Sequence, residues 1–157
     1  TAKGVEFDLR GTIFPGLNLV ANYAYTDSKV TKVTEGVTSI KEGDVIPGFA
    51  KHTANAWLYY KLPSEVLKGL SVSAGFTYMA DRATGTWSDT NTSVNLPDYF
   101  KLDGGVAWEN EKLKLSLNVF NILDEYLYSG GYYDWLSAYY WQTEAPVNFR
   151  LSLSYRF

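Results

Sequence analysis

Side chains that could bind a metal ion or act as nucleophiles are scarce in this sequence. It has one histidine, His52, and no cysteine, so these residues contain no thiol nucleophile, thiolate metal site or disulfide. Glu42 and Asp44 lie shortly before His52 and could be imagined as its partners in a metal site. A single imidazole without partners at the usual ligand spacing is a weak signal for metal binding. We therefore expect His52 to be structural and predict no metal site and no cofactor.

Three charged residues near the start of the chain could suggest acid–base chemistry. Glu6, Asp8 and Arg10 occupy alternate positions, and a positioned carboxylate can act as a general base. Alternate positions of an extended chain share one face, so this spacing also describes the polar face of a single β-strand. The lone histidine has no evident nucleophile partner, and no glycine-rich loop leads from a strand into a helix. The sequence therefore predicts no catalytic residues and a protein that is not an enzyme.

Aromatic rings are the most abundant groups in the sequence that could bind a ligand. They make up 17% of the residues, as 13 Tyr, 8 Phe and 5 Trp, and they are dense between residues 126 and 141. Such rings stack on planar or apolar ligands, and they also form belts at membrane interfaces. The net charge is −3, and without a basic excess we do not expect nucleic acid as a partner.

The segments that must position these residues alternate apolar and polar side chains. At the end of the chain, apolar or aromatic residues stand at every second position from Val147 to Phe157. This period is typical of a β-strand with one apolar face. All five prolines fall in turns or at strand ends, as expected because proline cannot donate to a β-ladder. The predicted strands are residues 5–13, 17–28, 52–62, 70–80, 99–108, 113–123 and 147–157, and no helix is convincing.

The connections between the predicted strands alternate between short turns and long loops. The long loops occupy roughly residues 28–49, 81–96 and 126–146. In an antiparallel meander, successive connections lie at opposite ends, so all short turns collect at one end and all long loops at the other. This asymmetry is typical of outer-membrane β-barrels, which have tight periplasmic turns and long external loops.

The apolar face of such a sheet could point into a soluble core or outward into lipid. A soluble up-and-down barrel of the lipocalin type is apolar inside. Lipid is favoured because the polar face is rich in Ser, Thr and Asn, the aromatic residues of the apolar face cluster near strand ends, and the strands are long enough to cross a bilayer.

The odd number of predicted strands indicates an incomplete wall, because bacterial single-chain barrels have an even number. We predict an all-β fold, an antiparallel up-and-down meander of about seven strands that is the C-terminal arc of a larger transmembrane β-barrel. Residues 1–157 would be a single segment of that barrel.

Four stretches of the sequence resemble TonB-dependent outer-membrane receptors of the siderophore-receptor branch. Residues 4–30 look like the family's strand pair around a Pro-Gly-Leu turn, and residues 46–62 look like its Pro-Lys-His-Thr element. Residues 96–128 resemble the penultimate strand pair, with the Leu-Asn-Val-Phe-Asn run of that family, and residues 145–157 resemble its closing strand. Together they cover nearly the whole chain in the family's order.

The resemblance implies uptake of an iron–siderophore complex across the outer membrane of a Gram-negative bacterium. The partners implied are a ferric siderophore, outer-membrane lipid, and TonB, which would act through an N-terminal region absent from this chain. The plug and the earlier barrel strands would also be absent. External aromatic residues of such receptors often line the ligand vestibule. The candidates for ligand contact here are Tyr132, Tyr133, Trp135 and Trp141.

The resemblance also gives a role to the alternation that runs to the last residue. In that family the last strand pairs with the first to close the barrel, and a terminal aromatic residue with alternating apolar residues serves as a signal for the barrel-assembly machinery. The residues that match this signal are Leu151, Leu153, Tyr155 and Phe157.

Two other functions remain open on the sequence. The chain could be a small closed β-barrel that binds an apolar ligand, either lipocalin-like or a small outer-membrane protein. It could also be an outer-membrane enzyme, although a catalytic constellation is missing. The first would need an even, closed set of strands, and a soluble binder would not depend on detergent.

Overall fold

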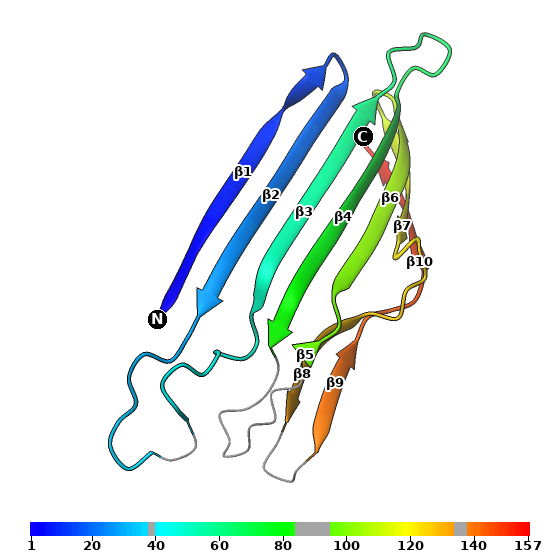
Figure 1. Ribbon diagram of the computed structural model, residues 1–157. Helices are drawn as coiled ribbons and strands as arrows, with labels where there is room; N and C mark the ends of the chain where they lie inside the picture. Colours follow the sequence, from blue (N-terminus) through cyan, green and yellow to red (C-terminus); the bar gives the residue numbers. More distant parts are fainter. Residues whose placement is uncertain (38–39, 84–94, 134–137) are drawn as a thin grey trace.

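The structure is a computed structural model that describes residues 1–37, 40–83, 95–133 and 138–157, with the side chains of Tyr132 and Tyr133 left out. Within these ranges no helix is long and apolar enough to cross a membrane. Seven long strands form one antiparallel sheet in which each strand lies beside the next (Figure 1). They are β1 (Ala2–Phe14), β2 (Leu17–Ser28), β3 (Ala50–Lys61), β4 (Leu70–Ala83), β6 (Tyr99–Glu109), β7 (Leu113–Phe120) and β10 (Asn148–Tyr155).

Three shorter strands lie at one end of this sheet. β5 (Asn95–Leu96) pairs with the end of β4, while β8 (Tyr128–Tyr133) and β9 (Tyr139–Thr143) form a separate hairpin. The described part of the β2–β3 connection, the hairpin and the N-terminus gather at this end, which we call the loop end (Figure 1). The short turns and the C-terminus lie at the opposite end, the turn end. The predicted meander of seven strands with sorted connections is therefore confirmed.

Some predicted boundaries and one predicted loop are wrong. β1 begins at Ala2, and β7 ends at Phe120 because Asn121 adopts φ 52° and turns the chain. β10 ends at Tyr155, so the last alternating residue, Phe157, lies beyond the strand. The stretch expected to be one long aromatic loop contains the β8–β9 hairpin, whose aromatic residues favour extended structure.

The pairing register keeps apolar side chains on one face of the whole sheet. Leu70, Trp108, Leu115 and Leu153 stand side by side on four neighbouring strands. Polar residues form matching rows on the other face: one of these rows is Asp8, Asn22, Asn55, Thr77 and Lys101. Because side chains alternate with period two, a slip of one residue would exchange the two faces.

The apolar face is not covered by any other part of the described chain. Phe149 and Leu151 are 77% and 67% exposed on β10, and Phe7 is 60% exposed on β1. Among the described residues, the only buried apolar side chains are those of Ala80, Leu96, Tyr99 and Leu127. The sheet is open, with β1 and β10 as its edges. The described chain is therefore not a small closed barrel around an apolar core.

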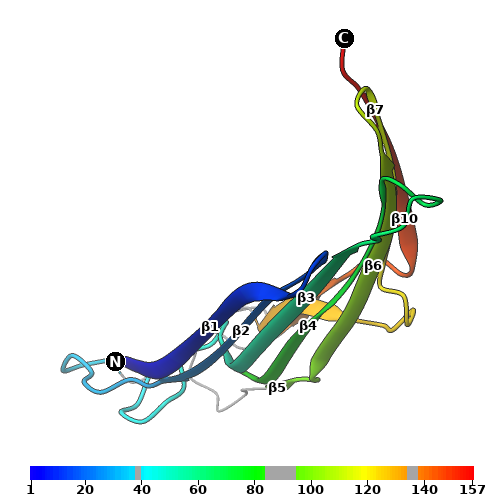
Figure 2. The same cartoon turned by 90° about the horizontal axis from the view of Figure 1, so that it is seen from above.

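The sheet is curved, and its polar face is concave. Figure 2 shows β9 inside the curve, while the turn between β3 and β4 projects on the convex side. The segment that carries β8 and β9 contacts Lys101 and Asp103 of the polar face through Glu144 and Asn121. The apolar residues therefore lie on the convex face.

A tryptophan on the polar face requires a glycine on the neighbouring strand. Trp57 of β3 pairs with Gly75 of β4, and its indole ring lies across the glycine. A β-carbon at Gly75 would lie 2.6 Å from the carbonyl oxygen of Ala56 and closer still to the indole of Trp57. The ring and the strand would therefore both have to move.

We predict that Gly75→Ala lowers the free energy of unfolding by about 1–3 kcal/mol, the usual cost of overpacking. Urea titration of the detergent-solubilised protein would measure the change. Gly11→Ala is the matched control, because a β-carbon on Gly11 would meet no atom within 4 Å. Equal stability of the two variants would show that Trp57 does not depend on this close approach.

Candidate functional site

The candidate site is an aromatic cluster on the β8–β9 hairpin at the loop end. The Trp141 and Tyr139 rings stack with centroids 5.5 Å apart and an interplanar angle of 9°. Tyr128 packs edge-on against Trp141 at 5.7 Å, and Tyr126 packs edge-on against Tyr128 at 5.2 Å. Trp141 is 43% and Tyr126 73% exposed. The cluster therefore holds ring faces in fixed orientations while leaving part of their surface open to a ligand.

A glycine opposite Trp141 lets its indole lie flat against β8. Gly131 pairs with Trp141 in the hairpin register. A β-carbon on Gly131 would lie 2.7 Å from Cε3 of Trp141. The small residue therefore helps to fix the plane of the indole.

Only one of the four predicted ligand-contact side chains can be placed in this cluster. Trp141 lies at its centre. Tyr132 and Tyr133 belong to β8, where their backbones pair with Tyr140 and Tyr139, but their side chains lie outside the described residues. Trp135 lies outside the described residues altogether. The dense aromatic stretch 126–141 includes Tyr126 and Tyr128, but their packing beside Trp141 depends on the hairpin register, and no local pattern marks it.

A buried arginine fastens the hairpin to the main sheet. Arg82, at the end of β4, is 5% exposed. Its Nη1 donates to the carbonyl oxygen of Tyr128 at 2.7 Å, and its Nη2 donates to that of Ser129 at 3.0 Å. Nη1 also lies 3.4 Å from the carbonyl oxygen of Pro97, and the guanidinium lies 5.5 Å from the ring centroid of Tyr99. Charge-assisted bonds of this kind are strong, so Arg82 fixes the start of β8.

A second attachment joins the end of β9 to β6. The Nζ atom of Lys101 lies 3.1 Å from Oε2 of Glu144, and both side chains are mostly shielded from solvent. Glu144 follows β9 directly, and its backbone nitrogen donates to the carbonyl oxygen of Leu127 at 2.9 Å. Because Tyr128 pairs with Thr143, both attachments hold the base of the hairpin, where β8 begins and β9 ends.

The turn after β7 is organised by one fully buried amide, Asn121. Its Nδ2 donates to the carbonyl oxygens of Glu125 and Ala145, at 2.9 and 3.2 Å, and its Oδ1 accepts from the backbone nitrogen of Glu125. Its own backbone nitrogen donates to Oδ1 of Asp103 at 2.8 Å. This side chain ties the beginning of the hairpin segment to its end.

His52 lies away from the aromatic cluster and has its own contacts. Its Nδ1 lies 2.8 Å from the hydroxyl of Tyr23, its ring packs against Tyr25 at 5.2 Å, and its Nε2 lies 3.8 Å from Oδ2 of Asp81. Asp44 instead accepts a bond from the backbone nitrogen of Lys41. Within the described ranges, no three His, Cys, Asp or Glu residues are grouped as metal ligands.

The four residues of the predicted assembly signal lie at the open edge of the sheet. Leu151, Leu153 and Tyr155 pair with Leu117, Leu115 and Leu113 on the apolar face. The Phe157 ring packs edge-on against Tyr155 at 5.3 Å. Their role in barrel assembly stays a prediction.

We predict that Arg82→Gln loosens the hairpin, because the shorter glutamine has one uncharged NH2 group in place of the two charged NH2 groups that bind Tyr128 and Ser129. Hydrogen exchange of the β8 and β9 backbone amides should become about tenfold faster, which corresponds to roughly 1.4 kcal/mol. Arg10→Gln is the control, since Arg10 is an exposed residue of β1. Unchanged exchange in Arg82→Gln would mean that Lys101 and Glu144 hold the hairpin without it.

Comparison with known proteins supports one family. Residues 1–122 match the family described as TonB dependent receptor-like, beta-barrel. The probable TonB-dependent siderophore receptor PiuA of Acinetobacter baumannii is 31% identical over 150 residues, which cover 90% of this chain and 18% of that protein. The ferric-pyoverdine 358 receptor of Pseudomonas putida is 30% identical over 156 residues, which cover 99% of this chain and 17% of that protein.

Solved structures give the same result for the fold. The crystal structure of the siderophore receptor PiuA from Acinetobacter baumannii matches with a TM-score of 0.78 and 26% identity, covering 98% of this chain and 21% of that one. The ferric yersiniabactin uptake receptor FyuA from Yersinia pestis matches with a TM-score of 0.81 and 17% identity, covering 99% and 23%. The chain spans about a fifth of the length of these relatives. It therefore belongs to the TonB-dependent receptor family and forms part of the β-barrel of such a protein.

Proposed function

We propose that this chain is the C-terminal wall of an outer-membrane receptor that takes up a ferric siderophore in a Gram-negative bacterium. The observation that carries the proposal is the continuous apolar convex face, opposite a polar concave face, on strands of up to 14 residues. A sheet exposing this much apolar surface is not stable in water, and lipid is the cover that suits an outward-facing barrel wall.

The two open edges support the view that the wall continues in a longer polypeptide. Among the described strands, β1 and β10 each pair on one side only, and long unpaired edges favour pairing with further strands. Earlier strands of the receptor would cover both edges and close the barrel. A plug and a TonB-contacting segment would belong to the same N-terminal region, and TonB would drive transport through them.

The aromatic cluster supports a ligand-binding role at the external mouth. It lies at the loop end, which in outer-membrane barrels faces the outside, and it presents partly open ring faces on a fastened hairpin. Relatives of this chain are named for ferric pyoverdine and ferrioxamine B. We infer that Trp141, together with Tyr132, Tyr133 and Trp135, contacts a ferric siderophore through the apolar and aromatic parts of the chelator.

An enzymatic function has no comparable support. The relatives named above are transport receptors. The single histidine, His52, contacts Tyr23 and Tyr25 on the apolar side of β3. The proposal is therefore a binding and transport function without catalysis.

We predict that Trp141→Ala weakens siderophore binding by the complete receptor roughly fivefold, because an aromatic contact contributes about 1 kcal/mol. Binding of a ferric catecholate and of a ferric hydroxamate siderophore to detergent-solubilised receptor would be measured by calorimetry. Trp108→Phe is the control, since Trp108 lies near the turn end of β6.

This experiment has three outcomes, and each leads to a different conclusion. Weaker binding of one siderophore by Trp141→Ala alone would support the role of the cluster. Equal binding by both variants would remove Trp141 from the ligand site. A receptor that binds neither siderophore class, or stays soluble without detergent, would contradict the proposed function itself.

A further inference from the structure

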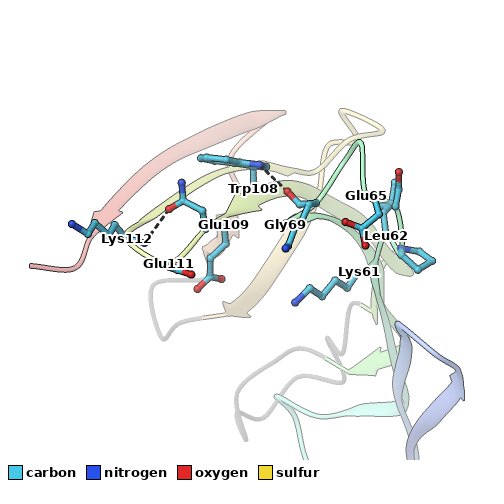
Figure 3. Close-up of a pocket in the computed structure, with 12 residues that line it drawn as sticks. Lys61, Leu62, Glu65, Gly69, Trp108, Glu109, Glu111 and Lys112 are labelled. Carbon is cyan, nitrogen blue, oxygen red and sulfur yellow. Dashed lines mark hydrogen bonds between the residues drawn. The ribbon is translucent and has the colours of Figure 1, made fainter.

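A groove at the turn end has a composition that the proposed uptake function does not explain. It lies between the β3–β4 turn and the β6–β7 turn, across the ends of β4 and β6 (Figure 3). Its volume is about 790 Å³, which is within the range of small-molecule sites. We call it the turn-end groove; its charged lining residues are Lys61, Lys68, Lys112, Glu65, Glu109 and Glu111.

Most of these charges have no partner of opposite sign among the described residues. Glu109 is paired, at 3.6 Å with Lys114 and at 3.3 Å with Arg156. In the part of the chain that the structure describes, the other five charged residues of the groove form no ion pair. The groove therefore offers both free ammonium groups and free carboxylates within one concavity.

Apolar groups lie directly beside these charges. Trp108 lines the groove from the apolar side of β6, and its Nε1 donates to the carbonyl oxygen of Lys68 at 3.1 Å. The β3–β4 turn projects on the convex side (Figure 2), and its Val66 and Leu67 are 93% and 44% exposed. Tryptophan and lysine are favoured at the level of lipid headgroups, where one end of the side chain is apolar and the other is wet.

We propose that the turn-end groove binds the headgroup of a zwitterionic phospholipid. The phosphate would meet Lys61, which points between the two walls of the groove (Figure 3), and Lys68. The ammonium would meet Glu65 and Glu111, and the acyl chains would follow the convex face past Trp108. A lone phosphate would leave the glutamate carboxylates of the groove without a partner. A headgroup that carries both a phosphate and an ammonium group complements both the lysines and the glutamates. The inference rests on the proposed membrane location of the sheet.

The test uses the complete receptor in detergent, with bound lipid counted by native mass spectrometry. Phosphatidylethanolamine is the probe, and phosphatidylglycerol and inorganic phosphate are the competitors. The double variant Lys61→Gln/Lys68→Gln should retain about fivefold less phosphatidylethanolamine, because two exposed charge pairs together contribute about 1 kcal/mol. The control is Lys32→Gln/Lys41→Gln, which removes two exposed lysines from the loop end.

The remaining outcomes would overturn the proposal. Equal lipid retention by the two double variants would show that the groove does not hold the headgroup. Stronger retention of phosphatidylglycerol, or displacement of lipid by inorganic phosphate, would show a general anion site. A receptor that needs detergent and binds its siderophore, yet shows one of these results, would contradict the lipid site alone and leave the proposed function intact.

Discussion

The register of the antiparallel sheet is the constraint on which the rest of the structure depends. Side chains alternate across a strand, so the two faces stay distinct only if every strand keeps its alignment with the next. The pairing holds from β1 to β10, and it collects rows such as Leu70, Trp108, Leu115 and Leu153 on one face. Nothing in the described chain covers that face. The register therefore makes the sheet depend on an apolar cover from outside the described chain.

On the concave face, the same alignment places the polar residues that hold the hairpin segment. Two of these residues near the loop end, Lys101 and Asp103, hold the segment through Glu144 and Asn121, and Arg82 holds the start of β8. These bonds are shielded from water by the segment that they fasten, which strengthens them. The long connection that carries the aromatic cluster is therefore bonded to the concave face of the sheet. The two proposed binding regions, the cluster and the turn-end groove, lie at opposite ends of the same strands.

The candidate site was predictable only in part. The density of aromatic residues after β7 pointed to the correct connection, and Trp141 lies at the centre of its cluster. The chain gave no local sign that the connection folds back as a hairpin, in whose register the Tyr128 ring contacts both Tyr126 and Trp141. Arg82 was missed for a similar reason: a single arginine at a strand end usually faces solvent, and its burial follows from a partner 46 residues away.

What the sequence determined by itself is what depends on neighbouring residues. The seven long strands, their apolar face and the sorting of turns and loops follow from a two-residue alternation interrupted by prolines and loops. What the tertiary structure decided is what depends on contacts between distant segments: the curvature, the hairpin, and the burial of Arg82 and Asn121. A local pattern restricts the face of the sheet on which a side chain lies. The partner of that side chain on another strand or connection is determined only when the strands align and the connections fold over the sheet.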